Sequence, residues 1–150
     1  MGELMKYKID KDRIYSNVYD AYSLDRMKLL GYCLQEKMVV FPKYHTAFIS
    51  ITDEELRRFN HRKGDTEGFV NVPFSVKGVR FTALFVEKKD RIKISFRSRG
   101  SFPVNRIAAG HFGGGGHINA AGGDSFRSME ATLKYFESLL PQYKEMLLDG

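Results

Sequence analysis

The spacing of apolar side chains indicates where the folded part of this 150-residue chain begins. Leucine and methionine residues recur every three or four positions between Leu24 and Met38. This spacing is typical of an amphipathic helix and predicts one over about 21–36. Asp20 or Ser23 is suited to cap its N-terminus. We expect the apolar face of this helix to contribute to a core.

The rest of the chain alternates between strand-like and helix-like patterns. The predicted strands cover residues 38–41, 45–51, 79–87, 91–98 and 124–126. The predicted helices cover residues 53–60, 103–111 and 119–122, and a last segment that begins after Ser128 and is broken by Pro141. A capping box is predicted at Thr52-Asp53-Glu54-Glu55, and a hairpin turn at Lys88-Lys89-Asp90.

These elements predict an α/β fold. We expect a single compact domain with a mixed β-sheet of about five strands flanked by helices, preceded by an N-terminal helical approach segment. The approach segment is placed at 1–37 and the sheet-containing domain at 38–150. A chain of this length can bury roughly two thirds of the surface that its unfolded form exposes, which is enough for independent folding.

Composition narrows the class of protein. The formal net charge of +6 favours anionic partners without by itself identifying nucleic acid. Cys33 is the single cysteine, so no disulfide framework is expected and a reducing, cytoplasmic location is the simplest setting. The first residues, Met1 to Lys6, are too polar for a signal peptide, and no apolar run reaches the length of a membrane span.

A glycine-rich stretch, residues 110–123, carries most of the functional information. Consecutive glycines are expected where the backbone needs positive φ or approaches another group closely. A helix beginning just after them would direct free N–H groups at one anion, with His117 at the mouth of the site. The stretch is not a P-loop, and Asn119 stands where a dinucleotide fingerprint needs its third glycine. A flexible connector is the alternative, and His111 is expected to be a packed histidine.

Arg97 is the side chain near this stretch that is best suited to hold phosphate. It stands at the end of the predicted strand 91–98, where ligand sites of α/β sheets commonly lie. Its planar guanidinium can donate two parallel hydrogen bonds to a phosphate, which lysine cannot reproduce. Lys93 and Ser95 share its strand face, which solvent exposure alone could explain.

Blocks from three parts of the chain together resemble a known family. They are Ser95-Phe96-Arg97-Ser98 with the later Gly-Gly-Gly-His-x-x-Ala-Ala-Gly, Pro42-Lys43-Tyr44-His45-Thr46-Ala47-Phe48-Ile49, and Gly64-Asp65-Thr66-Glu67-Gly68-Phe69-Val70-Asn71. The chain resembles the DHHA1 domain of DHH-family phosphoesterases, and is most similar to the bifunctional oligoribonuclease/pAp phosphatases, also labelled exopolyphosphatase-related. The resemblance runs over nearly the whole chain but covers only the C-terminal half of such an enzyme.

The resemblance implies a substrate-binding role. It implies that this chain holds the phosphates of short RNA or pAp, while an N-terminal DHH domain, in the same or a longer chain, holds catalytic Mn²⁺. The implied phosphate-binding residues are Arg97, Ser98, Arg99, Gly113, Gly114, Gly115, Gly116, His117 and Asn119. Asp65 and Glu67 form a second tier beside the implied nucleotide pocket, although capping of a turn before Pro73 also explains them. We nominate no catalytic residue, metal ligand or cofactor in this chain, and expect it to be inactive alone.

Other functions stay open at this point. A non-catalytic nucleic-acid-binding module would bind longer RNA more tightly, the role implied for DHHA1-like domains beside alanyl-tRNA synthetases. An exopolyphosphatase-type domain would bind phosphate chains, and a dimerisation or scaffold domain would use its glycines only for tight packing. The choice among dinucleotide, pAp, cyclic dinucleotide and polyphosphate is open, as is a homodimer.

Overall fold

A six-stranded mixed β-sheet forms the centre of the protein, in a computed structural model that describes residues 22–149. The strands are β1 (Val39–Phe41), β2 (Thr46–Ile51), β3 (Phe81–Glu87), β4 (Ile92–Ser98), β5 (Gly115–Gly116) and β6 (Ala120–Ser125). Their order across the sheet is β1-β2-β3-β4-β6-β5. β2 and β3 are parallel, and the other neighbouring pairs are antiparallel. The predicted α/β class is confirmed, with one strand more than expected.

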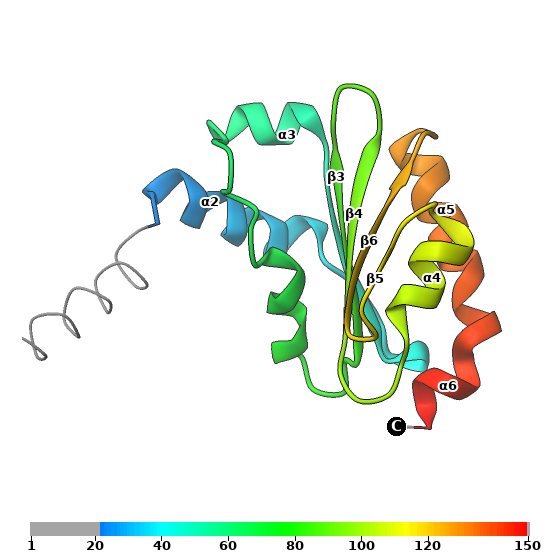
Figure 1. Ribbon diagram of the computed structural model, residues 1–150. Coiled ribbons are helices and arrows are strands. Elements are labelled where there is room, and N and C mark those ends of the chain that lie inside the picture. The colour runs from blue at the N-terminus through cyan, green and yellow to red at the C-terminus, as the bar shows by residue number, and fades with distance from the viewer. Residues whose placement is uncertain (1–21, 150) are drawn as a thin grey trace, which may run out of the picture.

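Helices cover both faces of this sheet (Figure 1). The α-helices are α2 (Leu24–Tyr32), α3 (Asp53–Arg58), α4 (Val104–His111), α5 (Met129–Leu139) and α6 (Lys144–Leu148). Shorter segments are the π-helix η1 (Cys33–Lys37), which continues α2, and the 3₁₀ helices η2 (Pro42–Tyr44), η3 (Phe69–Ser75) and η4 (Leu140–Tyr143). α2, α3 and η3 lie on one face, and α4, α5 and α6 lie on the other. None of the helices between residues 22 and 149 has the length and apolarity needed to span a membrane.

The larger core lies between the sheet and α4–α6 and is built around one phenylalanine. Phe136 of α5 contacts the rings of four strand phenylalanines, with centroid distances from 5.2 to 6.3 Å. These four rings belong to Phe48, Phe81, Phe85 and Phe96. Tilted and edge-to-face pairs at such distances are favourable beyond the area that they bury.

The second core lies on the opposite face and takes its strand residues from β2 and β3. Leu29 of α2, Cys33 of η1 and Phe69 of η3 are fully buried in it. Burial raises the pKa of the Cys33 thiol to about 12, so this side chain acts as a small apolar group. Because this core stops at β3, it leaves the same face of β4 and β6 uncovered.

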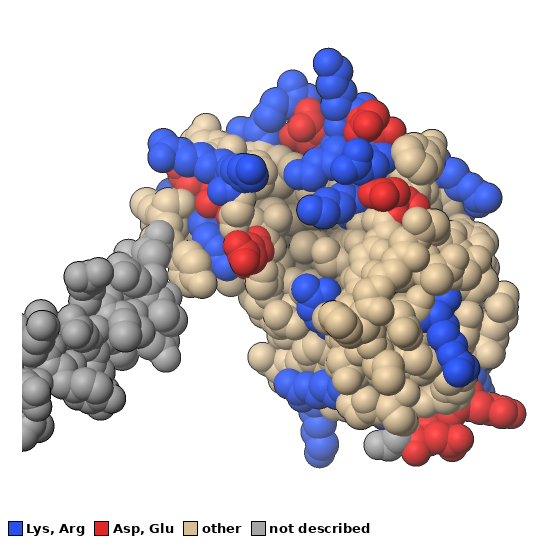
Figure 2. Space-filling view, in the orientation of Figure 1, with Lys and Arg blue, Asp and Glu red and all other residues tan. Residues whose placement is uncertain are grey.

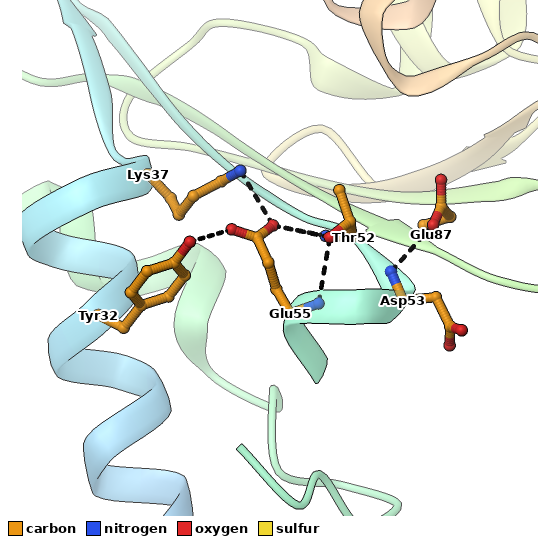
Figure 3. A network of polar contacts seen from close by, with 6 residues as sticks. All are labelled: Tyr32, Lys37, Thr52, Asp53, Glu55 and Glu87. Carbon is orange, nitrogen blue, oxygen red and sulfur yellow. Dashed lines mark hydrogen bonds and ion pairs between the residues drawn. The ribbon is translucent and has the colours of Figure 1, made fainter. Parts of the chain in front are cut away.

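A polar network ties the N-terminal helix to α3 (Figure 3). The carboxylate of Glu55 accepts a hydrogen bond from the Thr52 N–H at 2.9 Å, forms an ion pair with Lys37 at 3.0 Å and accepts from the Tyr32 hydroxyl. The Thr52 hydroxyl accepts in turn from the Glu55 N–H at 3.2 Å, so the predicted capping box is confirmed. The boundary at residue 37 stays a prediction, and residues 1–21 of the expected approach segment lie outside the described part.

Several predicted element ends are confirmed by their caps. The Ser23 hydroxyl accepts from the Arg26 N–H at 3.1 Å and begins α2, whereas Asp20 lies outside the described residues. Ser128 caps α5 in the same way through the Ala131 N–H. α5 ends just before Pro141, since proline lacks the N–H that would continue the helix.

The region after the glycines differs from the prediction. The helix expected over 119–122 is wrong, because residues 120–125 form strand β6. The strand expected over 124–126 instead begins at Ala120 and ends at Ser125, and it lies between β4 and β5 in the sheet. Paired glycines are unfavourable in a helix, and hydrogen bonding to the long strand β4 gives this segment a better alternative.

Candidate phosphate-binding cleft

The uncovered face of β4 carries three polar side chains in a row. Lys93, Ser95 and Arg97 alternate with Ile92, Ile94 and Phe96, which are buried in the phenylalanine core. Because successive side chains of a strand point to opposite faces, the polar three lie on the side that the second core leaves open. Arg97 is half-buried there, near the end of the strand.

A cleft of about 400 Å³ separates this strand face from the segment 61–70. Its cationic lining residues are Lys63, Lys88, Lys93 and Arg97. His61 and Glu67 also line it, so basic side chains outnumber acidic ones. Figure 2 shows Lys and Arg side chains gathered above the hollow between the two halves of the molecule. The cleft therefore favours an anionic ligand.

The charge of Arg97 is not neutralised by a neighbouring carboxylate. Its Nη1 donates to the backbone carbonyl of Phe96 at 2.8 Å, and in the described part of the chain no Asp or Glu oxygen lies within 4.0 Å of it. Burial lowers the pKa of His61, although Asp65 acts in the opposite direction. His61 is therefore mainly neutral at pH 7, and the lysines and Arg97 supply the positive charge.

The glycine run begins by ending a helix. Gly113 has φ of 60° just after the C-terminus of α4, and the Gly114 N–H donates to the Ala108 carbonyl at 2.9 Å. This is the usual way in which a glycine terminates a helix. The N–H of Gly114 is thus bound within the protein. The expected anion site at a helix N-terminus is wrong, because a strand follows the glycines.

Close packing explains part of the glycine run. A Cβ at Gly114 would lie 1.9 Å from the Gly122 carbonyl oxygen, and one at Gly116, where φ is 145°, would lie 2.6 Å from the Ala120 oxygen. A Cβ at Gly115 would meet nothing within 4 Å. Since Gly115 pairs with Gly122, these two residues form a flat area without side chains, here called the glycine shelf.

The shelf lies beside Arg97, Ala120 and His117, which are neighbours on β4, on β6 and in the segment after β5. Arg97 pairs with Ala120, and the His117 N–H donates to the Ala120 carbonyl at 2.7 Å. With neighbouring strands just under 5 Å apart, the backbones of Arg97 and His117 are about 10 Å apart. The His117 side chain is exposed. The fold therefore brings Arg97, His117 and Gly115 to one region of the surface.

Three other predicted phosphate-binding residues make hydrogen bonds or ring contacts within the protein. The Ser98 hydroxyl is buried and donates to the Phe102 carbonyl at 2.6 Å, and it accepts from the Asn119 side-chain amide at 3.0 Å. The guanidinium of Arg99 lies over the Phe74 ring at 4.6 Å from its centroid. These side chains shape the turns around the shelf and do not line the cleft.

Of the two second-tier carboxylates, Asp65 is used within the protein and Glu67 faces the cleft. Asp65 accepts from the Arg62 N–H at 2.9 Å and so stabilises its own turn, while Glu67 lines the cleft.

Sequence reasoning missed Lys63 and Lys88 as residues that line the cleft. Lys93 could have been found, because it shares a strand face with Arg97. No group of three His, Cys, Asp or Glu side chains in residues 22–149 is arranged to hold a metal ion.

The fold and the cleft together define an α/β domain with a mainly basic cleft on one face of its sheet. The chain belongs to the DHHA1 domain family, whose family model matches residues 43–140. The predicted resemblance is therefore confirmed.

Similar proteins from bacteria support the assignment to this family. The chain is 29% identical over 130 residues to the bifunctional oligoribonuclease and PAP phosphatase NrnA of Bacillus subtilis (strain 168), covering 87% of this chain and 40% of that protein. It is equally similar to the probable protein of that name from Streptococcus mutans, over 86% of this chain and 40% of that protein. The crystal structure of an exopolyphosphatase-related protein from Bacteroides fragilis matches with a TM-score of 0.89 and 49% identity, over 97% of this chain and 43% of that one. The chain thus spans 40% of the length of the curated relatives.

Proposed function

We propose that this chain is the substrate-binding half of a DHH-family, manganese-dependent phosphoesterase, acting in the cytoplasm on short oligoribonucleotides or pAp. The observation that carries the proposal is the row in which Ala120 joins Arg97 to His117 beside the glycine shelf. The names of the relatives, bifunctional oligoribonuclease and PAP phosphatase, support this substrate class.

Each part of this region has a chemical task in the proposal. The guanidinium of Arg97 donates hydrogen bonds to non-bridging oxygens of one phosphate. His117 donates a hydrogen bond from a ring N–H on the other side of that phosphate. The shelf at Gly115 and Gly122 lets the phosphate approach the backbone, since no side chain stands there. Donors arranged in this way stabilise the charge that develops during phosphodiester hydrolysis.

The catalytic metal belongs, in this proposal, to a DHH domain outside this chain. The described residues do not offer a donor set for manganese, and the chain matches only 40% of its curated relatives. Bound manganese would lower the pKa of a water molecule and so supply the nucleophile. The residues of this chain bind and orient the nucleotide so that its scissile phosphate faces that domain.

A second candidate function is a non-catalytic RNA-binding module. The Phe126 side chain is 80% exposed and lines a hollow of about 690 Å³ together with Lys88, Lys89, Arg91 and Arg127 and with the acidic residues Asp53, Glu87 and Asp90. An exposed aromatic ring near basic residues can stack on a base of single-stranded RNA. Affinity that keeps increasing with RNA length, and that falls on Phe126→Ala substitution, would favour this function over the first.

Equilibrium binding tests the proposed function. A labelled 5′-phosphorylated diribonucleotide is titrated with the wild-type chain, with Arg97→Ala and with the control Arg106→Ala, which removes an exposed arginine of α4. We expect saturable binding that Arg97→Ala weakens by about tenfold or more and Arg106→Ala leaves unchanged. Cooperative thermal unfolding of Arg97→Ala shows that the fold is intact. Equal affinities of wild type and Arg97→Ala contradict the proposal.

A further inference from the structure

We propose that Arg26 of α2 is a positioning residue for the ligand cleft. Residues 63–68, here called the cleft wall, face β4 across the cleft, and Arg26 holds this wall in place. Through this contact α2 sets the distance between the wall and Arg97. The inference rests on the proposed function, because the wall encloses the ligand that Arg97 binds.

The cleft wall is a run of tight turns between α3 and η3 (Figure 1). Its backbone hydrogen bonds are local. The Asp65 N–H donates to the Arg62 carbonyl at 3.0 Å, and the Glu67 N–H donates to the Gly64 carbonyl at 3.1 Å. A segment held only by such bonds opens easily, so it needs a contact from elsewhere to keep one position.

Arg26 supplies this contact. Its Nη2 donates to the Glu67 carbonyl at 2.8 Å, over 41 positions of the sequence. Among residues 22–149, this is the one hydrogen bond that joins the cleft wall to a part of the chain distant in the sequence. The position of the wall therefore depends on a residue that does not line the cleft.

Packing alone does not require an arginine at this position. The Arg26 side chain is 8% exposed, and its guanidinium lies over the rings of Tyr22 and Phe69, at 3.8 and 5.0 Å from their centroids. Within residues 22–149, no carboxylate oxygen lies within 4.0 Å of this guanidinium. A buried charge is costly, and an apolar side chain could fill the same space. The hydrogen bond to the wall is what an apolar side chain would lack.

α2 is fixed to the rest of the fold independently of the wall. Leu29 is fully buried in the second core, and the Tyr32 hydroxyl donates to Glu55 of α3. The helix thus gives Arg26 a firm base. Because the wall and Arg97 line the same cleft, the position of the wall decides how closely the protein surrounds a phosphate at Arg97.

Two substitutions on α2 form a matched pair for the test. Arg26→Met keeps much of the volume of the side chain but removes the donor to Glu67. Lys28→Met removes a positive charge from an exposed position of the same helix and leaves the wall untouched. Arg26→Lys keeps a donor without the planar guanidinium, so it should recover part of what Arg26→Met loses.

Hydrogen exchange of the full chain measures the wall without a ligand. We expect Arg26→Met to speed the exchange of the amides of residues 63–69 about tenfold, with the amides of β4 unchanged. Lys28→Met should match wild type. Cooperative thermal unfolding shows that each variant is folded, and if Arg26→Met is not, Arg26→Lys carries the same comparison.

Titration of the 5′-phosphorylated diribonucleotide pApA measures the consequence for the ligand. We expect Arg26→Met to weaken binding about fivefold and Lys28→Met to leave it unchanged. The salt dependence should stay that of wild type in Arg26→Met, because Arg26 does not touch the ligand. A lower salt dependence would place Arg26 on the ligand and overturn the positioning role.

The other outcomes are equally decisive. Unchanged exchange at residues 63–69, or faster exchange throughout the sheet, would show that Arg26 does not act on the wall in particular. If exchange rises at the wall while pApA affinity matches wild type, the wall does not position the ligand, and the inference is wrong while the proposed function stands. If wild type does not bind pApA, the proposed function fails and the inference with it.

Discussion

The side-chain amide of Asn119 donates one hydrogen bond to the Ser98 hydroxyl and another to the Gly100 carbonyl, each 3.0 Å long. The Ser98 N–H donates in return to the Asn119 carbonyl at 3.1 Å. These bonds tie the end of β4 to the turn between β5 and β6. The position of His117 relative to Arg97 therefore depends on a residue pair 21 positions apart in the sequence.

Asn119→Asp tests this tie with almost no change in size. A carboxylate cannot donate, so both bonds are lost and a negative charge faces the Gly100 carbonyl. We expect the free energy of unfolding to fall by about 1–3 kcal/mol and nucleotide binding to weaken. Denaturant unfolding measures the first effect. Asn71→Asp, at an exposed position of η3, is the charge-matched control, and equal stability of both variants would contradict the assignment.

Alanine substitutions of neighbouring glycines separate packing from ligand access. Gly114→Ala places a Cβ 1.9 Å from a backbone oxygen, so we expect a loss of more than about 3 kcal/mol or failure to fold cooperatively. Gly115→Ala meets open space and should change stability by less than about 1 kcal/mol. Its methyl group nevertheless occupies the shelf, so we expect weaker nucleotide binding. Unchanged affinity of a folded Gly115→Ala variant would contradict a ligand at the shelf.

The elements that could be predicted from the sequence are those decided by local interactions. The capping box at Thr52, the cap at Ser128 and the hairpin over residues 88–90 each depend on residues a few positions apart. Strand β6 could not be predicted, since an Ala-Ala-Gly-Gly run has no apolar period and its structure is decided by pairing with β4. Phe48 of β2 is buried, because both faces of this strand are covered.

The candidate site residues also divide into those that local sequence signals indicate and those that only the tertiary fold reveals. Arg97 and His117 were nominated because each stands beside a local signal, a strand end or a glycine run. Lys63 and Lys88 belong to segments that reach the cleft only through the tertiary fold. Ser98 and Asn119 were grouped with the ligand residues, and their side chains hydrogen-bond within the protein.

The pair Tyr32 and Glu55 predicts how stability depends on pH (Figure 3). Burial opposes the charge of Glu55, but hydrogen bonds from Tyr32, Thr52 and Lys37 outweigh it and hold the pKa below its usual 4.5. The hydrogen bond to Glu55 and then burial raise the pKa of Tyr32 above its usual 10.0. The contribution of Glu55 is thus complete above about pH 4.5 and lost on further acidification, and that of Tyr32 is complete below pH 10 and lost in stronger base.

Tyr32→Phe should therefore lower stability by about 1 kcal/mol at pH 7 and lessen the decline above pH 10. Unfolding free energies measured across the pH range test this, with Tyr22→Phe, at an exposed tyrosine, as the control. Parallel pH profiles of wild type and Tyr32→Phe in base would show that the hydrogen bond does not act as described.

His111 is predicted to act in stability and not in ligand binding. Its Nδ1 lies 3.0 Å from the Tyr135 hydroxyl and its Nε2 lies 2.9 Å from the Tyr143 hydroxyl, so it joins α4 to α5 and η4. His111→Ala leaves both hydroxyls without this partner, and we expect a loss of about 1–3 kcal/mol. Nucleotide affinity, measured where the variant is folded, should stay within about twofold of wild type. A large loss of affinity in a stable variant would place His111 in the site.

The salt dependence of nucleotide binding distinguishes the contribution of the charge of Arg97 from that of its planar guanidinium. Each phosphate contact by a cationic side chain releases counterions, so the logarithm of the binding constant falls with the logarithm of salt concentration. Arg97→Ala removes a charge and should lessen this slope by about 0.7. Arg97→Lys keeps the charge but loses the planar fork, so we expect weaker binding with the slope of wild type. Titrations of pApA from 50 to about 300 mM salt measure both quantities. If Arg97→Lys binds as tightly as wild type, the guanidinium acts as a point charge, and the bidentate arrangement at the end of β4 is wrong.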